Sequence, residues 1–180
     1  MSENAIARTQ AWIEHAVVGL NLCPFAKAPM IKGQIRYVVS ETDDPRVLLA
    51  SLCDEMHALV ATDPARIETT LVIHPNVLND FEDFNDFLGA ADAALADLGY
   101  EGVLQIASFH PHYRFEGAAD DDLSNATNRA PYPTLHLLRE ASVDRAVEAF
   151  PQAEAIYESN VRTMETLGAD GWRALSARWS

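Results

Sequence analysis

Three histidines stand beside prolines where apolar segments end. His74 follows "TTLVI" in the string "HPN", and His110 and His112 follow "VLQIASF" in the string "HPH". Residues i and i+2 of an extended chain point to the same side, and Pro111 fixes one backbone angle between the two rings. Neutral imidazole is a common ligand of zinc, iron and copper. The sequence therefore predicts that His74, His110 and His112 meet, either as ligands of a divalent metal or as acid–base groups.

A metal held in this way would take its fourth ligand from water or from an acidic side chain. The candidate carboxylates are Glu116 and residues 120–122 in the segment that follows. The alternative is that the histidines bond backbone carbonyls at the strand ends, and that the aspartates belong to a solvated loop. His136, inside "TLHLL", is expected to be a buried strand histidine with one hydrogen-bond partner.

Cations form a second group of candidates, because the chain has 13 Lys and Arg against 27 Asp and Glu. Arg129 in "TNRAPYP" offers a planar guanidinium to a carboxylate or phosphate of a substrate, and Arg114 can act in the same way. Asn125 and Asn128 add amide groups, so these four residues are the candidate substrate-binding set. The alternative is that Arg129 only ties down the acidic loop, for example through Asp121.

Cys23, in "NLCPFAK", is one of two cysteines and follows the end of a predicted helix. A thiol in a turn near a cation such as Lys27 can ionise and act as a nucleophile, with a histidine as its base. The alternative is a thiol that packs like a small apolar residue, as Cys53 is expected to do. We assign candidate catalytic roles to Cys23, His110 and Arg129.

Strands and helices alternate along the part of the chain that must position these residues. Strands are expected over 33–40, 69–75, 102–109 and 134–140, and helices over 3–20, 45–60, 80–98, 143–150, 153–168 and 172–180. Crossovers of this length return each strand parallel to the last, and the carboxyl ends of parallel strands meet at one edge. Residues 110–133 remain as a loop of the length that is usually functional or disordered.

The predicted fold is a single α/β domain over residues 1–180, with a small, mostly parallel sheet of about four strands flanked by helices. It consists of an N-terminal helix at 1–20, a sheet core at 33–140 and C-terminal helices at 142–180. Trp172 and Trp179 in the last segment would either cap the domain or form a homodimer contact.

The composition limits the partners. A net charge of −14 repels nucleic acid and anionic membranes, so a small molecule bound at a locally positive point is the expected partner. No stretch approaches the roughly 20 apolar residues that span a bilayer. The first residues lack the pattern of a signal peptide, and two cysteines do not make a disulfide framework. The expected compartment is the cytoplasm.

The strings "GLNLCPFA", "FHPHYRFEG" and "TNRAPYPTLHLLRE" together resemble a bacterial family catalogued as domain of unknown function 1415. The likeness spans nearly the whole chain. It implies a cytoplasmic bacterial protein of this length and assigns no activity. Five of the candidates fall in these strings, which favours them as site residues: Cys23, His110, His112, Asn128 and Arg129.

Three functions are compatible with these features. The first is an enzyme for a small polar or anionic substrate, with a histidine-rich site at the strand carboxyl ends and metal-assisted hydrolysis or oxidation as its chemistry. The second is a metal-free small-molecule-binding or regulatory module that uses the long loop as its contact surface. The third is a cysteine-dependent enzyme that uses Cys23.

Overall fold

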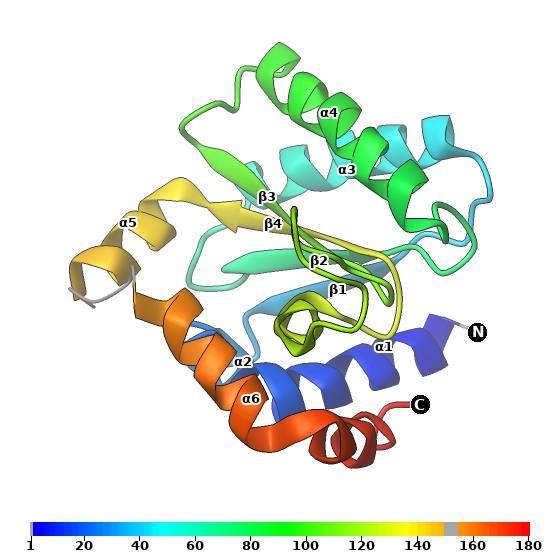
Figure 1. Cartoon of the computed structure of the whole chain (residues 1–180). Coiled ribbons are helices and arrows are strands. Elements are labelled where there is room, and N and C mark those ends of the chain that lie inside the picture. The colour runs from blue at the N-terminus through cyan, green and yellow to red at the C-terminus, as the bar shows by residue number, and fades with distance from the viewer. Residues whose placement is uncertain (1, 150–154) are drawn as a thin grey trace.

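The computed structural model describes residues 2–149 and 155–180. Within them, four strands form one mixed sheet in the order β1-β2-β4-β3 (Figure 1), with β1 at Ile35–Val39, β2 at Thr69–Ile73, β3 at Leu104–Phe109 and β4 at Thr134–Arg139. β1 pairs in parallel with β2, whereas β4 runs antiparallel to β2 and β3. The predicted four-stranded sheet with flanking helices and a helical C-terminal part is confirmed, but the prediction that the sheet is mostly parallel is wrong.

The mixed sheet results from the connection between β3 and β4. Residues 110–133 contain the short 3-10 helix η2 (Leu123–Asn128) instead of a helix that crosses back over the sheet. The chain therefore re-enters at the edge where it left, and Phe109 pairs with Thr134. β4 separates β2 from β3, so the carboxyl ends of these two strands lie about 10 Å apart rather than the about 5 Å of neighbouring strands.

Helices α3 (Pro45–Ala61) and α4 (Phe81–Asp97) cover one face of the sheet (Figure 1). Each begins at an aspartate that caps it: Asp44 accepts from the backbone N–H of Arg46, and Asp80 accepts from that of Glu82. Their apolar stripes pack on one side of β2, β3 and β4 to form the first core. It includes Leu48, Leu52, Met56, Val72, Phe84, Ala91, Leu104, Leu135 and Leu137.

The other face is covered by α1 (Ser2–Trp12), η1 (Ile13–Val18), α2 (Lys27–Ile31) and α6 (Ala155–Ser176) (Figure 1). The helix predicted over 3–20 is α-helical only as far as Trp12 and then π-helical through η1. Gly19 ends it, and a Cβ there would lie 2.3 Å from the carbonyl oxygen of His15, so no larger residue fits.

The C-terminal segment packs against the N-terminal helix. Arg8 donates to the Tyr132 hydroxyl at 2.7 Å and to the carbonyl of Trp179. The Trp172 and Trp179 rings lie 5.7 Å apart and pack on the second core, together with Trp12 and Leu71. The tryptophans therefore cap the domain, which is one of the two roles expected of them.

Helix α5 (Glu140–Ala149) leads from β4 toward α6. The predicted helices over 143–150 and 153–168 extend into residues 150–154, which lie outside the described residues. α6 joins the second of them to the one predicted over 172–180, across a kink at Gly168, where φ is 68°. Every helix within the described residues is too short or too polar to cross a bilayer.

Candidate functional site

His74 lies at the end of β2 and is fully buried. Its Nδ1–H donates to the carbonyl of Val77 at 3.0 Å, and its ring stacks on Phe84 with centroids 5.7 Å apart. Burial lowers the pKa of His74 to about 4, so the ring is neutral at neutral pH. Nε2 is buried and has no hydrogen-bond partner among the described residues.

His110 lies at the end of β3 and is also fully buried. The backbone N–H of His112 donates to its Nδ1 at 3.0 Å, so the proton is on Nε2, which donates to the carbonyl of Leu78 at 3.2 Å. Leu78 has a φ of 58°, a region that residues with side chains rarely adopt. The two imidazoles thus hold the turn after β2 by donating to the carbonyls of Val77 and Leu78.

This geometry gives the predicted metal centre at His74, His110 and His112 no support. Both ring nitrogens of His110 are occupied, and the His112 ring is exposed, with its centroid 5.9 Å from that of His110. Within residues 2–149 and 155–180, no group of three His, Cys, Asp or Glu side chains is placed to hold a metal ion. The alternative, in which the histidines bond backbone carbonyls, describes His74 and His110.

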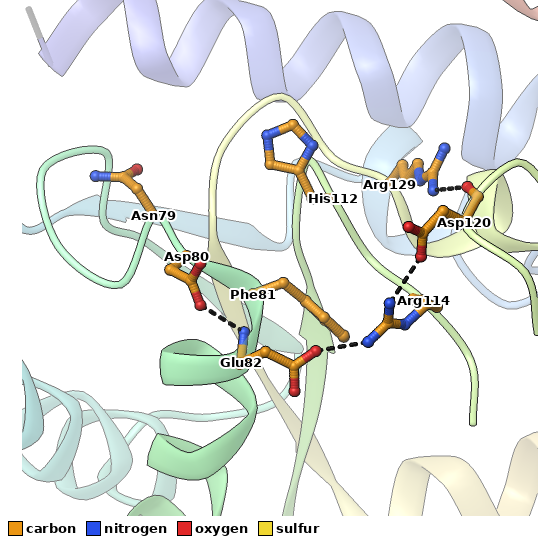
Figure 2. Close-up of a pocket in the computed structure, with 8 residues that line it drawn as sticks. All are labelled: Asn79, Asp80, Phe81, Glu82, His112, Arg114, Asp120 and Arg129. Atoms are coloured by element: carbon orange, nitrogen blue, oxygen red, sulfur yellow. Dashed lines mark hydrogen bonds and ion pairs between the residues drawn. The ribbon is translucent and has the colours of Figure 1, made fainter. Parts of the chain in front are cut away.

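A polar cleft of about 460 Å³ lies beside His112 (Figure 2). Arg114 crosses it, pairing with Glu82 at 2.6 Å and with Asp120 at 2.7 Å. Asp120 is thereby committed to Arg114, and Asp122 accepts from the backbone N–H of Ser124. The cleft is lined by Asn79, Asp80, Phe81, Glu82, His112, Arg114, Asp120 and Arg129.

Arg129 connects two parts of the loop over residues 110–133 through hydrogen bonds to backbone carbonyls. Its Nε donates to the carbonyl of Tyr113 at 3.1 Å and its Nη2 to that of Asp120 at 2.9 Å. Burial lowers the pKa of Arg129, and the charge of Asp120 opposes that effect. The predicted alternative, an arginine that ties down the acidic loop, matches these contacts, although the acceptors are backbone carbonyls rather than Asp121.

The two loop asparagines are used in the same way. Asn125 is fully buried, accepts from the backbone N–H of Phe115 at 3.0 Å and donates to the carbonyl of Ala119 at 2.8 Å. Asn128 donates to the carbonyl of Ser108 at 3.4 Å. The predicted substrate-binding roles of Asn125 and Asn128 therefore have no support, because their side-chain amides form hydrogen bonds with backbone groups of the chain.

A second, larger space of about 840 Å³ lies against the other face of the sheet, and we call it the sheet cavity. It lies between α1, which packs on β1, and α5, which packs on β4. Residues of α1, η1, the turn after them, α2 and α5 form its walls. The floor consists of Ile35, Thr69, Leu71, Gln105, Ala107, Phe109, His136 and Leu138.

The lining of the sheet cavity is mostly apolar, and its charged residues are mainly cationic. Lys32, Arg139 and Arg145 line it, against the single carboxylate of Glu68. The guanidinium of Arg139 is directed to the other face, because its Nη2 lies 2.8–2.9 Å from the carbonyls of Leu59, Thr62 and Ile67, at and beyond the end of α3. Lys32 and Arg145, both exposed, therefore place positive charge at the edge of this cavity in a chain with a net charge of −14.

His136 lies in the cavity floor, and Nε2 of its ring is 2.6 Å from the Thr69 hydroxyl. Burial lowers the pKa of His136 to about 4. The single hydrogen-bond partner agrees with the expectation for a strand histidine, but the position beside a cavity was not expected. No local sequence pattern indicates the cavity, because its walls come from segments far apart in the chain.

Cys23 is half-buried and lines the same cavity as His136. Burial raises the pKa of the Cys23 thiol, while hydrogen bonds from the backbone of Phe25 and Ala26 lower it in part. Lys27, the cation that was predicted to activate this thiol, is not among the groups that shift its pKa. Cys53 lies on α3, which covers the opposite face of the sheet.

A family model covers nearly the whole chain. It is described as protein of unknown function (DUF1415), and it matches residues 4–174 of 180. No curated protein and no solved structure matches the chain. The strings on which the resemblance was based include Cys23 and His136 of the sheet cavity and Arg129 of the polar cleft. This chain belongs to the DUF1415 family.

Proposed function

We propose that this protein is a metal-free small-molecule-binding protein, and that its ligand is an organic anion with an apolar body. The observation that carries the proposal is the sheet cavity, a space of about 840 Å³ with a mostly apolar lining and with Lys32 and Arg145 at its edge. Ligand pockets are typically concave, mostly apolar spaces of roughly 300–1,000 Å³ with a few polar groups. Positive charge in a strongly anionic chain favours an anion at that place.

The two parts of such a ligand have separate partners. Its apolar body would lie against Leu71, Phe109 and Ile13, and burying about 200 Å² of apolar ligand surface stabilises a complex by about 5 kcal/mol before the costs of association. The acid group would lie near Lys32 and Arg145, each worth about 0.2–1 kcal/mol at an exposed edge. Apolar burial therefore sets the affinity, and the cations set the preference for an anion.

A pair of fluorescent probes tests this division. 8-Anilinonaphthalene-1-sulfonate is an amphipathic anion, and N-phenyl-1-naphthylamine has the same rings without the charge. We expect the anion to bind with a 1:1 stoichiometry and more tightly than the neutral probe. In the double variant Lys32→Gln/Arg145→Gln, the anion binds about 2- to 30-fold more weakly and the neutral probe is nearly unaffected.

The control is Arg162→Gln/Arg178→Gln, which changes the net charge equally at exposed positions on and after α6. It leaves both affinities unchanged if the effect is local. Equal weakening by the two double variants would show that only net charge matters. Binding of neither probe to the wild-type protein would overturn the proposal.

A cysteine-dependent activity is the second candidate function. It is favoured by one observation, that Cys23 and His136 line the same cavity while the backbone of Phe25 and Ala26 bonds the sulfur. The burial-raised pKa opposes it, because the thiolate is the nucleophile. Selective alkylation of Cys23 over Cys53 at pH 7 would support this function. Alkylation of Cys23 that rises only above pH 9 would favour binding alone.

Metal-assisted hydrolysis or oxidation is not part of this proposal, since His110 has no lone pair left for a metal. The proposed setting is the bacterial cytoplasm, with a small molecule as partner. A net charge of −14 supports the exclusion of nucleic acid and anionic membranes.

A further inference from the structure

We infer that His136 selects the ligand of the sheet cavity by accepting a hydrogen bond at Nδ1, so that the ligand carries an N–H or O–H donor beside its apolar body. This inference rests on the proposed function, because a ligand must occupy the cavity for His136 to meet it. It narrows the ligand class from amphipathic anions in general to hydroxy or amino acids with an apolar body.

The hydroxyl of Thr69 fixes which ring nitrogen carries the proton. Thr69 Oγ1 lies 2.6 Å from the carbonyl oxygen of Leu137 and 2.6 Å from Nε2 of His136. A carbonyl oxygen can only accept, so the single hydroxyl proton is donated to Leu137. The hydroxyl oxygen must then accept from His136, which places the imidazole proton on Nε2 and leaves Nδ1 with a bare lone pair.

The lone pair on Nδ1 is open to the cavity. Among the described residues, no group forms a hydrogen bond with Nδ1 of His136, and this atom is not fully buried. Nε2 of His74, by contrast, is both unpartnered and fully buried. His136 is partly buried and lines the sheet cavity, so the accessible part of its ring faces that space. An acceptor fixed in this way at the floor of an apolar cavity discriminates between ligands by whether they donate.

The neighbouring groups keep the ring in this form. Burial holds the pKa of His136 at about 4, so Nδ1 remains an acceptor at neutral pH. The Phe109 ring lies 6.0 Å from the imidazole, and Leu71 and Ala107 flank His136 on the paired strands. A ligand without a donor would leave the lone pair without a partner, which costs more than a hydrogen bond typically gains.

The test uses two anionic fluorescent probes that differ by one donor, 6-hydroxynaphthalene-2-sulfonate and its 6-methoxy analogue. We expect wild-type protein to bind the hydroxy probe about 3- to 10-fold more tightly than the methoxy probe. The variant His136→Gln keeps a donor for Thr69 and removes the acceptor at the Nδ1 position, so the preference disappears. The variant His136→Asn places its amide oxygen near the Nδ1 position and retains the preference.

Each outcome decides between the two proposals. Equal binding of both probes by wild type, or a preference that persists in His136→Gln, overturns the role of His136 while the cavity proposal stands. Binding of neither probe overturns both. Urea unfolding of the two variants checks that they fold, and the ¹⁵N shifts of the His136 ring in the wild-type protein provide a readout independent of ligand. Protonation of Nδ1 instead of Nε2 there would also overturn the inference.

Discussion

Acid should destabilise this protein in a pH range set by its buried histidines. The pKa of His74 is about 4 in the folded protein and 6.5 as the ordinary value, and that of His136 is lowered to the same extent. A histidine whose pKa is lowered by folding contributes stability that is complete above pH 6.5 and is lost as the pH falls toward 4. Burial also lowers the pKa of His110, so it acts in the same direction.

The size of the effect follows from the two pKa values. Between pH 7.5 and 4.5, a group that changes from 6.5 in the unfolded chain to about 4 in the fold loses about 2.5 kcal/mol of folding free energy. His74 and His136 together therefore lose about 5 kcal/mol, which is comparable with the total stability of many domains. The two aspartates with lowered pKa values, Asp44 and Asp122, contribute little in this range, because their effect falls below about pH 4.

The assay is urea unfolding followed by tryptophan fluorescence at several pH values and constant ionic strength. The variant His74→Asn retains a side-chain N–H for Val77, and should reduce the loss between pH 7.5 and 4.5 by about 2.5 kcal/mol. The control Leu95→Ala removes packing from the first core and lowers stability by about 2–5 kcal/mol at every pH, without changing the slope. Parallel curves for wild type and His74→Asn would refute this account of His74.

Two other predictions concern the scaffold around the candidate sites. Gly19→Ala should destabilise the protein by about 1–3 kcal/mol, since the new Cβ meets the His15 carbonyl, whereas Gly89→Ala in α4 has open space and should stabilise by about 0.4–1 kcal/mol. Calorimetric melting of both variants checks this, and an equal effect of the two would contradict it. Arg129→Ala should increase hydrogen exchange across 110–128, because the carbonyls of Tyr113 and Asp120 lose their donor; unchanged exchange would show that Arg129 does not hold the loop.

Local features of the fold were predictable because their causes lie within a few residues. Asp44 followed by Pro45 marks the start of α3, and Asp80 marks that of α4. The position of β4 could not be predicted from the sequence, because it depends on a loop that folds back at one edge of the sheet instead of crossing over it. The π-helical form of η1, which contributes Ile13 and Val17 to the sheet cavity, likewise has no sequence signal.

The candidate site was predictable only in part. His74 and His110 both pack on the Phe84 ring, but their hydrogen-bond partners are carbonyls of a turn, and a residue string does not reveal that. The sheet cavity is a space left between α1, α5 and the strands. No single segment contains it, so Lys32, His136 and Arg145 could not be grouped from spacing alone.

The central claim is that an organic anion binds inside the sheet cavity. Cys23 lines that cavity and Cys53 lies on α3, so the two thiols report on the two faces of the sheet. We would measure the alkylation rates of both by N-ethylmaleimide at pH 8, with and without saturating 8-anilinonaphthalene-1-sulfonate. The account predicts that the bound anion slows alkylation of Cys23 and leaves that of Cys53 unchanged. Saturable binding of the anion with no protection of Cys23 would place the ligand elsewhere and contradict the account.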